Sequence, residues 1–175
     1  DLLFVARHRE LERDRRGRPP RRSRARGRVD RPTRFEPIPP PAGDDDLIVT
    51  NSHVVSAAVL YPGQYRLEFL TDDNRLGRLQ VMAIDVRNDL ALVKATEDDL
   101  DLPPLRLREE IPRQGERAYS IGFPLDLGLT ITEGVANGLV ATVLEARIHY
   151  TGAINSGMSG GPALDARGAV YGVNV

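Results

Sequence analysis

The segment Ala153–Pro162, AINSGMSGGP, holds the residues of this sequence that are best placed to do chemistry. Its centre is Ser159, with glycines at positions 157, 160 and 161 around it. A serine hydroxyl becomes a strong nucleophile when a base takes its proton and backbone N–H groups face the developing oxyanion. Glycine permits the tight turn that would bring the N–H groups of Gly157 and Ser159 to one point. The segment therefore predicts a nucleophile loop, although a polar loop between strands explains this short motif equally well on its own.

Two polar residues at the ends of apolar runs supply the partners that such a serine needs. One apolar run breaks into polar residues at His53, and Asp89 directly precedes another. Histidine serves as a general base for serine, and a carboxylate holds the imidazole in the required tautomer. Taken alone, His53 fits a surface histidine after a strand and Asp89 fits a turn residue. Asp85 is a second candidate orienter, but it lies inside a predicted strand, so we predict a triad of His53, Asp89 and Ser159.

Four motifs together resemble the trypsin-like serine proteases, and within them the HtrA/Deg branch. They are TNSHVV at residues 50–55, NDLALV at 88–93, FPLDLGLTITEGVANG at 123–138 and INSGMSGGP at 154–162. Histidine, aspartate and serine follow one another in the chain order of the chymotrypsin-type triad. The resemblance covers about residues 46–175. It implies a serine endopeptidase with the chymotrypsin-like fold, in which two antiparallel barrels of about six strands each meet at the active site.

The resemblance also implies a role for each site residue. Ser159 is the expected nucleophile, His53 the base that later protonates the leaving amine, and Asp89 the residue that orients the imidazole. The N–H groups of Gly157 and Ser159 are the expected oxyanion hole. Met158 stands where proteases activated by a newly cut N-terminus carry an aspartate. We therefore expect ordering of the loop, rather than N-terminal insertion, to control activity.

The walls of the pocket for the P1 side chain are implied by the same resemblance. They are the segment before the serine and the strand after it, here Ala153, Ile154 and Asn155 with Val173, Asn174 and Val175. None of these residues is acidic, which argues against arginine or lysine at P1 and favours a small or medium aliphatic side chain. Alternatively, Ile154 and Val173 belong to the barrel core.

Composition excludes several other classes of site. The 175 residues include no cysteine, so disulfides, thiolate metal sites and a cysteine nucleophile are absent. The three histidines have no ligand-like spacing, so we expect neither a metal nor another cofactor. No apolar run approaches the roughly 20 residues that span a bilayer. The resemblance favours an extracytoplasmic location, periplasmic or secreted in a bacterium.

Residues 1–43 differ in composition from the rest of the chain. They hold 13 arginines against 6 acidic residues, whereas residues 44–175 hold 11 basic against 19 acidic residues. Between residues 13 and 34 almost nothing apolar could offset the ordering entropy of about 1–2 kcal/mol per residue. We therefore predict a disordered Arg/Pro-rich segment. The alternative is an arm that binds nucleic acid or an anionic surface, but no aromatic residues interleave the arginines as a stacking platform would require.

The remaining residues read as short strands separated by turns, which is typical of β-barrels. We predict a first barrel half at residues 44–108, with His53 and Asp89, and a second at 109–175, with Ser159. We expect the barrels to be incomplete at both ends, lacking a first strand or two and the last strand after Val175. The predicted strands are 47–50, 57–61, 65–70, 76–84 and 90–95, then 118–123, 127–132, 138–144, 147–150, 162–164 and 169–174.

Two functions compete at this point. The first is an endopeptidase that cleaves unfolded or exposed polypeptides through an acyl-enzyme and that is compatible with a homo-oligomer. The second is an inactive, polypeptide-binding module that holds a peptide along an exposed strand edge without cutting it.

Overall fold

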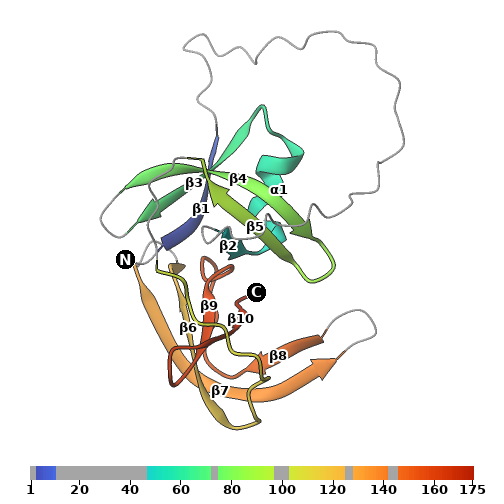
Figure 1. Ribbon diagram of the computed structural model, residues 1–175, viewed down its shortest axis with the longest axis vertical. Helices are drawn as coiled ribbons and strands as arrows, with labels where there is room; N and C mark the ends of the chain where they lie inside the picture. Colours follow the sequence, from blue (N-terminus) through green and yellow to red (C-terminus); the bar gives the residue numbers. More distant parts are fainter. Residues whose placement is uncertain (1–2, 11–46, 72–74, 97–102, 125–127, 142–145) are drawn as a thin grey trace.

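The computed structural model describes residues 3–10, 47–71, 75–96, 103–124, 128–141 and 146–175. These residues form two antiparallel five-stranded sheets and one α-helix. The sheets form two halves, one above the other, and an extended connection joins them (Figure 1). This arrangement confirms the predicted chymotrypsin-like fold class. No helix in the described part of the chain is long and apolar enough to cross a membrane.

The first half contains a sheet with the strand order β1-β3-β4-β5-β2. Its strands are β1 (Leu3–Glu10), β2 (Leu47–Thr50), β3 (Tyr65–Thr71), β4 (Leu76–Asp85) and β5 (Leu90–Ala95). Side chains of β3, β4 and β5 that lie on one face of the sheet pack against Val55 from the segment between β2 and β3. The resulting core consists of Val55, Leu67, Phe69, Leu79, Ala91 and Val93.

The helix α1 (Ser52–Leu60) replaces a strand that we predicted at residues 57–61, and that prediction was wrong. The apolar run AAVLY at residues 57–61, which ends at Pro62 and Gly63, suggested a short strand. Tertiary packing decides otherwise: Val55 is fully buried in the core, and α1 contacts β1, β3, β4 and β5. Pro62 and Gly63 follow the end of the helix, as is common after a helix C-terminus.

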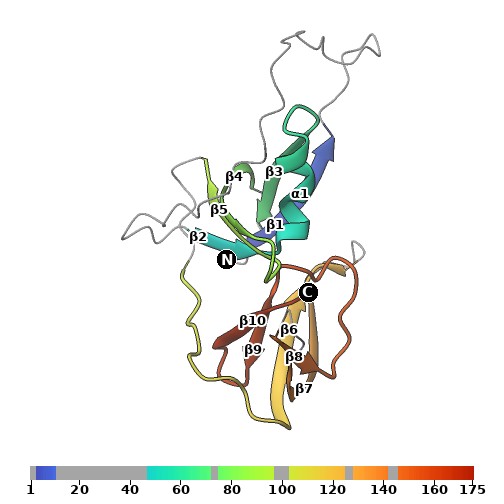
Figure 2. The ribbon, with the colours of Figure 1, turned by 90° about the vertical axis from the view of Figure 1, so that its right-hand side faces the viewer.

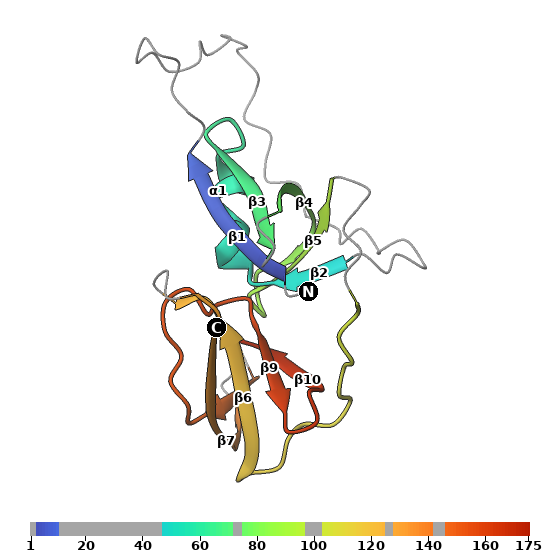
Figure 3. The ribbon, with the colours of Figure 1, turned by 90° about the vertical axis from the view of Figure 1, so that its left-hand side faces the viewer.

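Strand β1 comes from the segment that we predicted to be unstructured, and the structure differs from that prediction here. It pairs antiparallel with β3, from Leu3 opposite Thr71 to Glu10 opposite Tyr65. Figure 3 shows the two strands side by side. A strand therefore does precede the histidine region, contrary to our expectation. Residues 11–46, which include the Arg-rich stretch, lie outside the described residues.

The second half contains a sheet with the order β10-β9-β6-β7-β8. Its strands are β6 (Glu116–Gly122), β7 (Thr130–Ala141), β8 (Ala146–Tyr150), β9 (Pro162–Asp165) and β10 (Val170–Val173). The predicted hairpin of β9 and β10 is confirmed. We predicted separate strands at 127–132 and 138–144, but β7 is one continuous strand that overlaps both. It has a bulge between Ala136 and Leu139 that contains Gly138 at φ +92°.

The connection between the halves lies along the edge of the second sheet (Figure 2). The N–H of Arg108 donates to Val170 O at 2.8 Å, and the N–H of Val170 donates to Arg106 O at 2.9 Å. The Arg108 guanidinium binds the Glu116 carboxylate and lies 3.5 Å from an oxygen of Asp165. These contacts fix the connection to both β6 and the β9–β10 hairpin.

Candidate active site

His53 and Asp89 form a direct pair in the first half. His53 is the second residue of α1, and Asp89 ends the turn between β4 and β5. His53 Nδ1 lies 2.7 Å from Asp89 Oδ2, and the His53 backbone N–H donates to Asp89 Oδ1 at 3.0 Å. A carboxylate only accepts hydrogen bonds, so the pairing puts an N–H at Nδ1, and in the neutral imidazole Nε2 is then the acceptor. That tautomer is the one that a general base acting through Nε2 requires.

The backbone of Asp89 is held in an unusual conformation by the residues before His53. Its φ of +54° lies in the left-handed region, which non-glycine residues seldom adopt, although aspartate tolerates it better than most. The Asn51 side-chain amide donates to Asp89 O at 3.0 Å, and the Ser52 N–H donates to the same oxygen at 3.2 Å. The conformation thus turns the carboxylate toward His53 at a cost in backbone energy that these hydrogen bonds offset.

The carboxylate of Asp89 also caps the N-terminus of α1. Asn51, at the N-cap position, makes no capping bond with its side chain, and Asp89 Oδ1 takes that role by accepting the His53 N–H. Burial acts to raise the pKa of Asp89, but hydrogen bonds from the Ser52 hydroxyl, the His53 N–H and the His53 ring outweigh it and hold the pKa below its ordinary value. The group therefore stays ionised at neutral pH.

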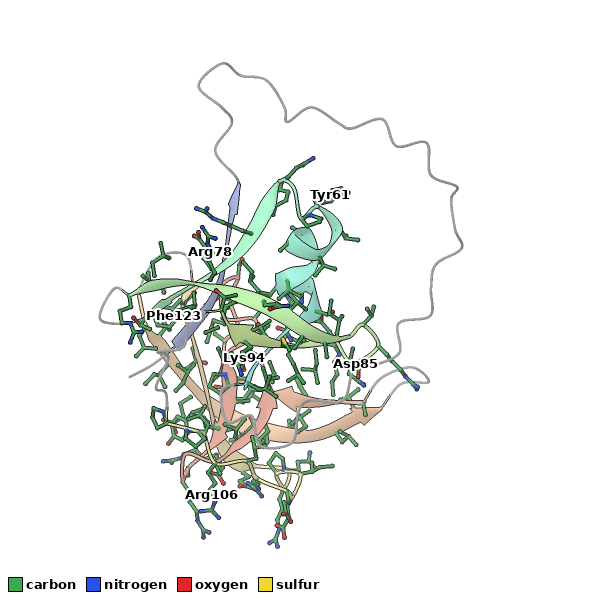
Figure 4. The ribbon with its side chains drawn as sticks, turned by 45° about the horizontal axis from the view of Figure 1, so that its top comes forward. Tyr61, Arg78, Asp85, Lys94, Arg106 and Phe123 are labelled. Atoms are coloured by element: carbon green, nitrogen blue, oxygen red, sulfur yellow. The ribbon has the colours of Figure 1, made fainter. Side chains whose placement is uncertain are left out.

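Asp85, the other candidate orienter, serves a different purpose. It lies at the end of β4 (Figure 4) and accepts hydrogen bonds from the backbone and the side chain of Asn88. The bond from the Asn88 side chain, together with the backbone bond, lowers the pKa of Asp85. Asp85 thus shapes the turn that leads to Asp89. Among the described residues, its carboxylate has no hydrogen bond to His53.

The segment from Asn155 to Gly161 consists of two successive tight turns. The N–H of Met158 donates to Asn155 O at 3.0 Å, and the N–H of Gly161 donates to Met158 O at 3.1 Å. The third residue of each turn is a glycine with positive φ, +95° at Gly157 and +84° at Gly160. A closed turn with positive φ at the third position only is of type II. Ser159 therefore occupies the second position of the second turn, where it is half-buried.

The first turn leaves two N–H groups for an anion. The N–H groups of Gly157 and Ser159 donate to no acceptor among the described residues. On its other side, Gly157 accepts a hydrogen bond of 3.2 Å from the N–H of Phe123, which is labelled in Figure 4. A Cβ at position 157 would lie 2.5 Å from Phe123 O, so only glycine fits there. The two unpaired donors are separated by Met158 in the sequence, and they remain the candidate donors of an oxyanion hole.

Met158 and Asn174 support the two turns from the buried side. Met158, the residue that both turns share, is fully buried and packs against Gly122 of β6. The Asn174 side-chain amide donates to Ile121 O at 3.1 Å and to Met158 O at 3.3 Å. Its backbone exchanges hydrogen bonds with Gly160 and Gly161. We predicted Asn174 as a pocket wall, and that role stays a prediction. The structure also gives Asn174 a supporting position that the sequence motif did not indicate.

The two halves meet directly behind Ser159. Gly160 faces Thr50, the last residue of β2, so closely that a Cβ would overlap Thr50 Oγ1 and lie 3.6 Å from the N of Asn51. The loop that carries Ser159 thus contacts Thr50, which precedes His53 by three residues in the sequence. Among the described residues, however, Ser159 Oγ has no hydrogen bond to His53. His53 and Asp89 are therefore paired, and the loop that carries Ser159 packs against the first half. Within the described residues, the hydrogen bond between Ser159 and His53 is not formed.

The other predicted pocket residues have varied positions. Ala153, Ile154, Asn155 and Val175 are exposed, and Val173 is half-buried in β10. A separate hollow of about 320 Å³ lies in the first half, between α1 and strands β3 and β4. None of the predicted site residues lines it. In the described part of the chain, no group of three or more acidic, histidine or cysteine side chains could hold a metal ion.

Known proteins share both the sequence and this fold. The sequence pattern of the trypsin-like peptidase domain matches residues 42–173. Serine protease HTR4 of Rattus norvegicus is 34% identical over 75% of the chain, and serine protease HTRA1 of Xenopus laevis is 33% identical over 75%. A periplasmic serine endoprotease DegP-like protein of Bartonella henselae is 32% identical over 74%. The matches span 27%, 29% and 25% of these relatives, so the chain corresponds to about a quarter to a third of their length.

Solved structures agree with these relatives. The HtrA-type protease AlgW with a tripeptide superposes with a TM-score of 0.65 and 31% identity, covering 75% of this chain and 43% of AlgW. Deg5 superposes with a TM-score of 0.65 and 29% identity, covering 74% of this chain and 68% of Deg5. The chain therefore belongs to the trypsin-like peptidase family, in its HtrA branch.

Proposed function

We propose that this protein is a serine endopeptidase that hydrolyses peptide bonds in unfolded or exposed polypeptides through an acyl-enzyme. The observation that carries the proposal is the pair of type II turns, which presents Ser159 at a corner next to two unpaired N–H groups. That loop abuts the half that carries the ionised Asp89 and its hydrogen bond to His53. Membership of a family whose relatives are named serine proteases supports the same activity.

In the proposed mechanism, Ser159 Oγ attacks the carbonyl carbon of the scissile bond while His53 Nε2 takes the hydroxyl proton. The resulting imidazolium is stabilised by the Asp89 carboxylate at Nδ1. His53 then gives the proton to the leaving amine as the C–N bond breaks. A water molecule, deprotonated by the same nitrogen, releases the acyl group and restores Ser159.

The N–H groups of Gly157 and Ser159 would stabilise the oxyanion of both tetrahedral intermediates. Removing one such donor typically costs about 3–4 kcal/mol of transition-state stabilisation, because the donors are already oriented before charge develops. The missing hydrogen bond between His53 and Ser159 is compatible with this role. Catalytic hydrogen bonds are often long in the absence of substrate and tighten in the Michaelis complex.

The substrate preference follows from the residues beside the nucleophile loop. Ala153, Ile154 and Val173 carry no charge that would pair with a basic P1 side chain, so we propose a small or medium aliphatic P1 residue. The periplasmic name of one relative supports an extracytoplasmic location. Unfolded polypeptide in that compartment is the substrate class that we propose.

Cleavage of unfolded casein by the full chain tests the proposal. We expect fragments to accumulate with the wild type and not with Ser159→Ala or His53→Ala. The new N-termini should follow alanine, valine or isoleucine; cuts mainly after arginine or lysine would overturn the proposed preference. Undiminished cleavage by Ser159→Ala would overturn the mechanism. Casein binding by a wild type that does not cleave would favour the non-catalytic, polypeptide-binding module.

A further inference from the structure

Ser52, next to His53, makes a contact that none of the roles above requires. Its hydroxyl donates to Asp89 Oδ1 at 2.7 Å, which is in the short range typical of hydrogen bonds to a charged acceptor. Its backbone N–H donates to Asp89 O at 3.2 Å. Ser52 thus contacts Asp89 at both the main chain and the side chain.

The two oxygens of the Asp89 carboxylate have different partners. Within the described part of the chain, Oδ2 bonds only the His53 ring, at 2.7 Å, whereas Oδ1 receives the Ser52 hydroxyl at 2.7 Å and the His53 N–H at 3.0 Å. The rotation of the carboxylate about its Cβ–Cγ bond is therefore fixed from the Oδ1 side. Of the two donors there, the Ser52 hydroxyl is the closer one.

The Ser52 hydroxyl is not needed to start the helix. Ser52 is the first residue of α1, where a serine can bond a free N–H of the first turn. Here the hydroxyl instead donates to Asp89, and Asp89 itself accepts the N–H of the first turn. A neighbouring serine, Ser56, shows the ordinary behaviour, because its hydroxyl donates to the His53 carbonyl within the helix at 2.8 Å.

The hydrogen bond from Ser52 to Asp89 is important because the site is open to solvent. The His53 side chain is 51% exposed and that of Asp89 is 18% exposed, so water competes for the oxygens of the carboxylate. Without the Ser52 hydroxyl, Oδ1 would retain one longer bond, and the carboxylate could rotate to share its protein donors with water. The imidazole would then lose part of the restraint that keeps Nε2 directed at the nucleophile.

We propose that Ser52 is a positioning residue of the catalytic base, which fixes the Asp89 carboxylate so that Oδ2 faces His53 Nδ1. This inference rests on the proposed function for its effect on rate, but its structural part can be tested without activity. It assigns to Ser52 an effect on the chemical step and none on substrate binding.

The kinetic test compares Ser52→Ala, Ser52→Thr and the matched control Ser56→Ala in the full chain, with a fluorogenic peptide that carries valine at P1. We expect kcat of Ser52→Ala to fall about tenfold to a hundredfold, as for loss of a hydrogen bond to a charged group, with KM unchanged. Ser52→Thr should recover most of the loss, since it restores the hydroxyl, and Ser56→Ala should behave like the wild type. Wild-type kcat in Ser52→Ala, or equal losses in all three variants, would overturn the proposal.

An NMR titration tests the same contact whether or not the protein cleaves peptides. The carboxyl carbon of Asp89 should titrate at higher pH in Ser52→Ala than in the wild type, because a hydrogen bond to the charged form is lost. Ser56→Ala should leave that titration unchanged. If the wild type does not cleave and the titration shifts as expected, the proposed function fails and the position of Ser52 stands. An unchanged titration in Ser52→Ala overturns the Ser52 inference by itself.

Discussion

The two halves of this protein hold their parts of the site by different means. In the first half, three side chains bind Asp89. The Asn51 amide donates to its main-chain carbonyl, and the Ser52 hydroxyl and the His53 ring bind its ionised carboxylate. In the second half, the backbone holds the loop that carries Ser159 through two type II turns whose glycines press against neighbouring main chain and side chains. The position of the base therefore depends on charge and hydrogen bonding, whereas that of the nucleophile depends on space and backbone conformation.

The largest effect should follow from filling the space at Gly160. In Gly160→Ala, the new Cβ would overlap Thr50 Oγ1 in a residue with φ +84°, so we expect reaction of Ser159 with a fluorophosphonate to fall below detection. The strain of left-handed φ alone costs an alanine about 1–2 kcal/mol. Thermal unfolding and labelling of the same sample measure both effects.

Gly168→Ala provides the matched control for that change. Gly168 also has positive φ, +75°, but nothing lies within 4 Å of a Cβ there. It should therefore show the conformational cost without loss of labelling. Equal labelling of both variants would mean that the space at Gly160 does not matter to the nucleophile.

The second largest effect should come from the charge in the first half. Asp89→Asn keeps the shape of the side chain but removes its charge and replaces one acceptor oxygen by an N–H donor, which favours the wrong tautomer of His53. By analogy with other triads, kcat should fall by about 10⁴. The control is Asp85→Asn. The Asp85 carboxylate lies four residues earlier and binds Asn88, so its replacement should leave kcat near the wild-type value. Similar losses in the two variants would contradict the assignment of Asp89 as the orienter.

Part of this comparison could be predicted from the sequence. The strands at Leu47–Thr50 and Leu90–Ala95 were predicted at their observed bounds, because short apolar runs between turn residues leave little choice. The glycines around Ser159 indicated the tight loop. The positions of His53 and Asp89 came from motifs, since the contact of a helix residue with a turn 36 residues away has no local signal.

Other features, namely the helix α1, the strand β1 and the role of Asn174, depend on tertiary contacts that a local sequence pattern does not specify. The apolar run at residues 57–61 suggested a strand, but burial of Val55 in the core of the first half favours the helix. Strand β1 pairs with β3, about sixty residues later, while its own segment looked too polar to fold. The support that Asn174 gives to Met158 depends on where two carbonyl groups lie, and a motif does not specify that.

A smaller effect should follow from weakening the support of the second half. Asn174→Ala removes two donors from the carbonyl groups of Ile121 and Met158, which should cost about 1–3 kcal/mol of stability and slow labelling of Ser159. Asn137→Ala, which removes an exposed asparagine of β7, is the control and should change neither value measurably. Wild-type stability of Asn174→Ala would show that the two turns do not need the hydrogen bonds of the Asn174 side chain.

The smallest effect concerns the ion pair that fixes the connection, and it depends on pH. The Arg108 guanidinium, with the Arg113 N–H, lowers the pKa of Glu116 to about 2. A lowered pKa means that the pair stabilises the fold above the ordinary glutamate range and that this contribution is lost as pH falls through about 2. Glu116→Gln should therefore have a lower thermal midpoint than the wild type at pH 6, and the difference should shrink with acidification. A difference that grows toward low pH would contradict this.

The central claim is that His53 and Asp89 of the first half activate Ser159 of the second. It is tested most directly by labelling the full chain with a fluorophosphonate and locating the modified residue by mass spectrometry. We expect rapid modification of Ser159 in the wild type, none in Ser159→Ala and greatly slowed modification in His53→Ala. Modification at another residue, or an unchanged rate in His53→Ala, would contradict it.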